Sequence, residues 1–164
     1  MATAPAWLLD FGKGQFAAVG ERELLHIVYQ PRLHRVPQAD AHCDRVMAWE
    51  GGFLPVWDLA AWFKWTKIAD GSGLAAVVGY ADEDSGRTLR GVICIDLPPK
   101  RVNVNDEDAC ALPDTRWERL ATSCFLYETV RVPTLDLAAM FRAPLTAPES
   151  GPRAAYDRSP RGDR

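Results

Sequence analysis

The sequence predicts a single all-β domain with short helices, built as two similar lobes. Three observations support this fold class. The chain has 164 residues, the length of one domain. Short apolar segments alternate with polar or glycine-containing turns, as in β-hairpins. One ten-residue element occurs twice. A composition of 48% hydrophobic and 25% charged residues is ordinary for a soluble globular domain and disfavours a disordered, collagen-like or coiled-coil body.

The repeat is the strongest feature. Residues Leu54–Phe63 read LPVWDLAAWF, and 78 residues later Val132–Phe141 read VPTLDLAAMF. The aspartate of each copy is a favoured N-cap, because its carboxylate can accept the unpaired N–H groups of a following helical turn. The leucine and phenylalanine after it are four positions apart and share one helical face. Each copy therefore predicts a strand, a turn and a short amphipathic helix, and two copies predict two lobes.

The other strands follow from apolar runs between turns. Two hairpins are predicted, 15–19 with 23–29 and 74–80 with 88–97. Two further strand pairs are 45–49 with 53–57 and 123–127 with 129–135.

Prolines 31, 37, 98 and 99 are expected to end the strands before them, because proline cannot donate to a sheet ladder. We therefore expect a domain over 1–145, with lobes at about 14–70 and 71–142. Residues 146–164 are rich in Pro, Gly, Ser and Arg without periodicity, which predicts a disordered tail.

Charge and cysteine usage restrict the class of partner and the compartment. A net charge of −3 and a pI of about 5.6 disfavour nucleic-acid binding. The four cysteines form no C-x-x-C pair, which disfavours a zinc knuckle or a redox dithiol and favours a cytoplasmic protein with reduced thiols. No signal peptide or apolar run of about 20 residues is found, so direct membrane insertion is not expected.

A search for catalytic chemistry finds none. The sequence lacks the G-x-S-x-G, H-E-x-x-H and dinucleotide motifs, and Gly12-Lys13-Gly14 lacks the rest of a P-loop. His42-Cys43 has no second ligand pair, and the acidic runs 82–84 and 106–108 lack the EF-hand spacing. We expect no catalytic residue, no metal and no cofactor. An unrecognised small β-barrel enzyme or ligand carrier is the alternative.

Three segments follow one another along the chain: Leu25–Pro31 with Val36-Pro37, the block VMAWEGGFLPVWDL over Val46–Leu59, and the closing element Val132–Phe141. By the order and spacing of these segments, residues 14–142 resemble a CheW-like domain. The residues of the block that fit the family pattern are Val46, Met47, Gly51, Leu54, Pro55, Val56, Asp58 and Leu59.

The resemblance implies two five-stranded antiparallel barrels that pack through a shared core. It also implies a non-enzymatic adaptor in the cytoplasm, associated with membrane-bound receptor arrays. Such an adaptor couples the cytoplasmic tip of a methyl-accepting chemoreceptor to the regulatory domain of a CheA-type histidine kinase. The alternative within this family is a diverged binding module that regulates or competes for the kinase without receptor coupling.

Candidate partner-binding residues lie around the turn at 48–51. Val36, Val46, Ala48 and Glu50 are proposed from their positions in the family motif, and Arg45 and Trp49 on physical grounds. Glu50 stands where chemotaxis members carry an arginine, and Arg45 where the family has a glycine. These departures indicate a divergent member, for which a type IV pilus (twitching) pathway is one interpretation.

The sequence gives different expectations for the burial of two tryptophans near this turn. Trp57 is expected in the core, because leucine occupies the matching position of the second copy. For Trp49, an exposed interface anchor and a buried position are both open.

Overall fold

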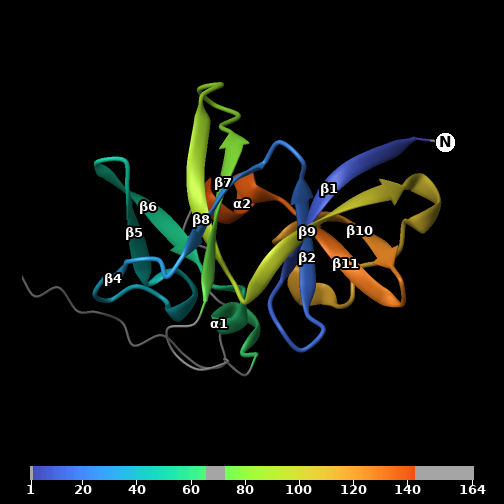
Figure 1. The fold of residues 1–164 in the computed structure, drawn as a ribbon, viewed down its shortest axis with the longest axis horizontal. Helices are drawn as coiled ribbons and strands as arrows, with labels where there is room; N and C mark the ends of the chain where they lie inside the picture. Colours follow the sequence, from blue (N-terminus) through green and yellow to red (C-terminus); the bar gives the residue numbers. More distant parts are fainter. Residues whose placement is uncertain (1, 66–72, 143–164) are drawn as a thin grey trace, which may run out of the picture.

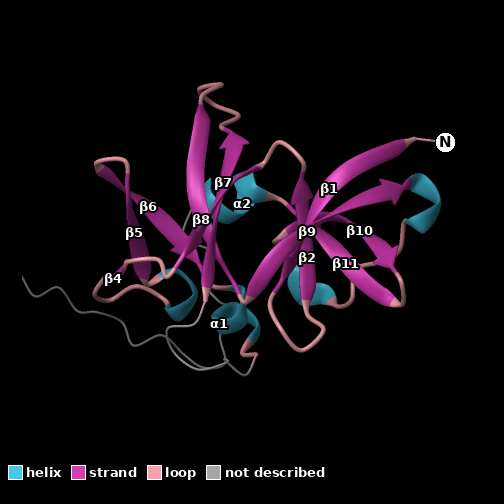
Figure 2. Cartoon of the chain, viewed as in Figure 1, coloured by secondary structure: helices cyan, strands magenta, loops and turns pink. Residues whose placement is uncertain are grey.

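The computed structural model describes residues 2–65 and 73–142 and contains two curled β-sheets that lie side by side. Figure 1 shows one sheet on each side, with two short helices between them, and Figure 2 shows how much of the chain is strand. The predicted tail at 146–164 lies outside the described residues.

The first sheet, lobe A, has the strand order β10-β11-β2-β1-β9, and the second, lobe B, has the order β3-β7-β8-β6-β5-β4. The strands are β1 (Thr3–Asp10), β2 (Phe16–Gly20), β3 (Leu24–Tyr29), β4 (Leu33–Arg35), β5 (Arg45–Trp49), β6 (Gly52–Trp57), β7 (Leu74–Ala81), β8 (Thr88–Ile95), β9 (Leu97–Asn105), β10 (Ala121–Tyr127) and β11 (Val130–Leu135). The helices are α1 (Leu59–Phe63) and α2 (Leu137–Arg142), and the 3-10 turns are η1 (Ala41–Cys43), η2 (Asp106–Asp108) and η3 (Thr115–Trp117).

The predicted all-β fold of two lobes is confirmed, but the lobes do not divide the chain at 70/71. Lobe A combines β1 and β2 with β9, β10 and β11 from the far end of the chain, and lobe B takes β3 to β8. Lobe B has six strands instead of five, because β4 extends its edge. Each lobe also contains one parallel pair, β11 with β2 and β6 with β8, so the sheets are not purely antiparallel.

The exchange of strands has a simple geometric cause. In lobe A, β2 is bonded on both sides, to β1 and β11, so β3 finds no free edge there and crosses to lobe B. In the same way β8 lies between β7 and β6, and only Asp96 separates it from β9. A hairpin needs a loop of about two residues, so β9 continues into lobe A.

These crossings decide which strand predictions hold. The pairs β7–β8, β5–β6 and β10–β11 are antiparallel as expected. The predicted hairpin of 15–19 with 23–29 is wrong, because β2 and β3 belong to different sheets. Pro98 and Pro99 do not end a strand but lie within β9, an edge strand, where proline is tolerated. Strand β1 was not anticipated.

The predicted repeat is confirmed in detail. Asp58 caps α1 by accepting the Ala61 N–H at 3.2 Å, and Asp136 caps α2 by accepting the Ala139 N–H at 3.1 Å. The backbone N–H of Asp58 donates to the His42 carbonyl and that of Asp136 to the Leu120 carbonyl, at 2.8 and 2.7 Å. His42 and Leu120 are also 78 residues apart, so the duplication extends beyond the ten matching residues.

Three apolar clusters hold the fold together. One fills each lobe, around Ala18 and Val132 in lobe A and around Met47 and Val92 in lobe B. The largest lies between the lobes and includes residues of α1 and α2. Trp57 belongs to it, as predicted, with 3% of its surface exposed, and its indole Nε1–H donates to the Met140 carbonyl at 2.9 Å. This bond ties the first copy of the repeat to the helix of the second.

Glu23 gives the fold a pH dependence at the crossing from lobe A to lobe B. Its Oε1 accepts the Gly20 N–H at 2.7 Å, and burial, with a further contribution from Asp136, raises the pKa of this carboxyl above its ordinary value of 4.5. Because folding raises the pKa of the Glu23 carboxyl, this group stabilises the folded state fully at pH values below 4.5, where it is protonated. This contribution is lost as the pH rises through the folded-state pKa.

We therefore expect Glu23→Gln, whose amide oxygen can keep the Gly20 bond, to gain stability relative to the wild type between pH 4.5 and pH 7. Urea unfolding at the two pH values measures this difference. The exposed Glu107→Gln is the control and should show no such trend. A difference between Glu23→Gln and wild type that is the same at both pH values would contradict the assignment.

Candidate partner-binding surface

The outer side of β4, β5 and β6 carries exposed apolar side chains. Opposed residues of an antiparallel pair lie on the same side of a sheet. His34 is paired with Val46 and Val46 with Pro55, while Ala48 is paired with Phe53. We call this surface, completed by Val36 beyond the end of β4, the β4–β6 face. The Val36 N–H donates to the Asp44 carbonyl at 2.6 Å and so extends the β4–β5 ladder.

Phe53 dominates the β4–β6 face. It is 66% exposed, and its ring meets the His34 ring edge-on at 5.9 Å. Val36 is also among the exposed large apolar residues, and Ala48 and Pro55 are exposed beside them. A protruding aromatic residue on an exposed apolar surface is typical of a protein interface, where aromatic residues supply much of the binding energy.

The turn between β5 and β6 forms one end of this surface. Glu50 and Gly51 have φ values of 46° and 79°, and Trp49 is paired with Gly52 across them. Positive φ at both central residues is the geometry of a two-residue type I′ turn. The Glu50 carboxylate is paired with the Arg90 guanidinium of β8 at 3.0 Å, and both side chains are exposed. Glu50 therefore presents a paired charge to a partner instead of a lone negative charge.

Trp49 points to the opposite side of β5 from Ala48. It packs against the apolar cluster inside lobe B and contacts the His26 ring at 5.2 Å. Its indole Nε1 is buried and finds no hydrogen-bond partner among the described residues. Of the two open positions for Trp49, the structure shows the one turned into the lobe.

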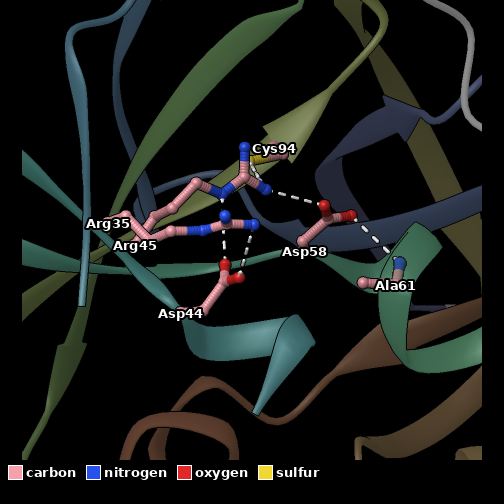
Figure 3. A network of polar contacts seen from close by, with 6 residues as sticks. All are labelled: Arg35, Asp44, Arg45, Asp58, Ala61 and Cys94. Carbon is pink, nitrogen blue, oxygen red and sulfur yellow. Dashed lines mark hydrogen bonds and ion pairs between the residues drawn. The ribbon is translucent and has the colours of Figure 1, made fainter. Parts of the chain in front are cut away.

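Arg45 is held in a polar network at the other end of β5 (Figure 3). Its guanidinium lies 2.7 Å from the Asp58 carboxylate and 3.5 Å from that of Asp44, which also meets Arg35 at 3.7 Å. The Arg45 guanidinium also lies 3.9 Å from the Cys94 sulfur. Asp58 thus uses one oxygen to cap α1 and the other to bind Arg45. The arginine that replaces the family glycine has a structural contact inside the protein.

The structure thus separates the six predicted residues into two sets. Val36, Val46 and Ala48 lie on the β4–β6 face, with Glu50 at its end. Arg45 and Trp49 lie on the opposite side of β5, where Arg45 contacts Asp58 and Trp49 packs against the core of lobe B.

Sequence reasoning missed Phe53, His34 and Arg90. The alternation of sides along β6 would have placed Phe53 on the same side as Pro55. No local pattern could have paired Arg90 with Glu50, since the two are 40 residues apart.

A cavity of about 410 Å³ lies elsewhere, lined by residues of α1, η3 and β11. Its walls include Phe63, Trp65 and Trp117, but its Arg116 is bound by both oxygens of Asp114, at 2.9 and 3.1 Å. Of the two arginines that line the cavity, Arg116 is therefore already paired, and we place the candidate site on the β4–β6 face, where predicted partner-binding residues gather.

Other kinds of site were sought across residues 2–65 and 73–142. No cluster of three or more His, Cys, Asp or Glu side chains that could hold a metal ion is found in these ranges. Nor does any helix in the described parts of the chain have the length and apolar character needed to cross a membrane.

Comparison with known proteins agrees with the two-lobed fold. A family model for the CheW-like domain matches residues 12–144. The fold is similar to the crystal structure of scaffolding protein TtCheW from Thermoanaerobacter tengcongensis, with a TM-score of 0.68 and 11% sequence identity. The similarity covers 87% of this chain and 94% of that one. A search of curated protein sequences found no significant match. Because the family model spans most of the sequence, including both copies of the repeat, this chain belongs to the CheW-like domain family.

Proposed function

We propose that this protein is a non-enzymatic adaptor that couples a chemoreceptor to a CheA-type histidine kinase in a bacterial chemotaxis or twitching-motility complex. It acts in the cytoplasm, at the cytoplasmic tips of membrane-bound receptors, and binds the regulatory domain of the kinase. The observation that carries the proposal is the exposed β4–β6 face, formed by the strands that bear the family motif. The fold shared with a scaffolding protein supports it.

The chemistry of the face suits a protein partner. The β4–β6 face is an exposed sheet surface with one protruding aromatic ring, that of Phe53, beside smaller apolar side chains. The partner should therefore present a complementary apolar surface with a cavity for Phe53. The charged pair of Glu50 and Arg90 lies at the edge, where charges influence partner choice and association rate more than affinity.

Arg90 replaces the cation that the β5–β6 turn has lost. In the chemotaxis members that the sequence resembles, the residue before the turn glycine is an arginine, and here it is Glu50. The Arg90 guanidinium lies 3.0 Å from the Glu50 carboxylate, so a positive group still lies at this turn, contributed by β8. We propose that Arg90 makes the contact that the turn arginine makes elsewhere.

Titration of this protein with the regulatory domain of a histidine kinase from the same cell tests the function. We expect a micromolar Kd, or about −8 kcal/mol. Co-sedimentation with receptor-containing vesicles and the kinase then tests coupling, and all three proteins should be found in the pellet. Kinase binding without receptor binding would support the competing regulator instead. If a folded protein gave no heat of binding at two temperatures, the adaptor assignment would be rejected.

Charge substitutions test the role of Arg90. Arg90→Ala removes the proposed contact and should weaken kinase or receptor binding roughly five- to tenfold. Glu50→Ala frees Arg90 for the partner and should leave affinity equal or higher. Arg101→Ala, which breaks a similarly exposed ion pair with Glu21 in lobe A, is the control. If Glu50→Ala weakened binding as much as Arg90→Ala, the carboxylate itself would be the contact.

A further inference from the structure

Cys110 and Cys124 lie face to face at the edge of lobe A. Ala109 forms an antiparallel bridge with Phe125, which brings the next residue, Cys110, opposite Cys124. The Cys110 N–H donates to the Cys124 carbonyl at 2.9 Å. The two Sγ atoms are 3.2 Å apart, and both cysteines are free thiols.

This position suits a disulfide without rearrangement of the backbone. Opposed residues in antiparallel strands have Cα atoms roughly 4.5–5.5 Å apart, within the range that disulfides adopt. The sulfurs would have to approach by only about 1.2 Å to reach the bond length of a disulfide. Rotation about the side-chain torsions of the less buried Cys110 can supply this movement.

The two thiols differ in accessibility. Cys124 is 5% exposed within lobe A, whereas Cys110 is only partly buried. Burial, followed by the contact with Cys110, raises the pKa of the Cys124 thiol to about 12. An oxidant in solution therefore meets the Cys110 sulfur first, and Cys124 acts second from a fixed position beside it.

We propose that Cys110 and Cys124 form a reversible intramolecular disulfide when the protein meets a small disulfide oxidant such as oxidised glutathione. The Cys110 thiol loses its proton, and its sulfur attacks the oxidant to form a mixed disulfide, releasing one glutathione thiolate. The Cys124 sulfur, losing its proton in turn, attacks the Cys110 sulfur and displaces the second glutathione thiolate. The two glutathione thiolates take up two protons. In the net reaction the protein loses two hydrogen atoms and the oxidant gains them.

The bond would stabilise the central core. It closes the segment between residues 110 and 124, which carries Trp117 and Leu120 of the cluster between the lobes. Closing a loop of about this length restricts the unfolded chain and should raise Tm by roughly 6–12 °C. Oxidation would thus stiffen the contact between lobe A and the core without touching the β4–β6 face.

Peptide mapping tests this proposal. The reduced protein is treated with oxidised glutathione, alkylated under denaturing conditions and digested with trypsin, which cuts at Arg116 and Arg119 between the two cysteines. We expect a linked pair of peptides, one with Cys110 and one with Cys124, that is lost after treatment with dithiothreitol. The oxidised protein should also show the higher Tm.

Two variants serve as controls. Cys94→Ser, which removes another partly buried thiol, should leave the linked peptides unchanged. Cys110→Ser changes the more accessible partner, which spares the buried site, and should abolish both the linked peptides and the rise in Tm. The proposal is overturned if wild-type protein stops at a mixed disulfide on Cys110 while Cys124 is still alkylated. It is also overturned if both thiols are fully alkylated after oxidation of a folded sample.

Discussion

Replacing Asp58 by alanine is expected to lower the free energy of unfolding by about 3 kcal/mol. The change removes the cap of α1 and also the carboxylate that lies 2.7 Å from the Arg45 guanidinium. Asp58 is nearly buried, and Arg45 is mostly buried beside it, so the arginine would lose its closest carboxylate in a poorly hydrated place. Urea or guanidinium unfolding, monitored by tryptophan fluorescence, measures the loss.

The internal repeat provides a matched control for this prediction. Asp136 makes the same capping bond in α2, but the residue that matches Arg45 in the second copy is Ser123, which carries no charge. Asp136→Ala should therefore cost at most about 1 kcal/mol, the value of a cap, because it also removes the Asp136 charge that raises the pKa of Glu23. Equal losses in the two variants would mean that the Arg45 contact adds nothing to stability. Asp58→Asn, which can still accept the Ala61 N–H, should fall between the two.

Replacing Phe53 by serine is expected to weaken binding of the kinase regulatory domain at least tenfold, which corresponds to about 1.4 kcal/mol or more. Phe53 is 66% exposed in the free protein, so it contributes little to folding and its side chain is available to fill a cavity on the partner. Calorimetric titration measures the change in Kd, and an unchanged Tm shows that the fold is intact.

Tyr29→Ser is the matched control for Phe53→Ser. Tyr29 is an aromatic residue of nearly equal exposure, 67%, on β3, which lies at the other end of the strand order of lobe B from β4. Its loss should leave the Kd within about twofold. If Phe53→Ser bound as tightly as wild type, the β4–β6 face would not be the kinase contact. A larger effect of Tyr29→Ser would move the contact to β3.

The features that could be predicted from the sequence are the local ones. The aspartate caps of α1 and α2, the pairs β5–β6 and β7–β8, and the buried Trp57 depend on residues close together in the chain or on the comparison of two copies. The Glu50-Gly51 turn belongs to the same class, because two residues between two strands allow few backbone geometries. Val36, Val46 and Ala48 could be chosen as candidates from their positions in the family motif, which is a pattern of residues close together in the chain.

The sequence by itself determined two repeated units, each with a strand pair and a capped helix. Only the tertiary structure decided how the units share strands. Both edges of β2 and of β8 are already occupied, so β3 joins lobe B and β9 joins lobe A. The predicted division of the chain into lobes at 70/71 is therefore wrong. The pairs Arg45–Asp58, Glu50–Arg90 and Cys110–Cys124 also depend on how the folded chain brings together residues separated in sequence by 13, 40 and 14 positions. Hydrophobic spacing sets the side of a strand on which a residue lies, but the choice of neighbouring strand is made by the packing of the whole domain.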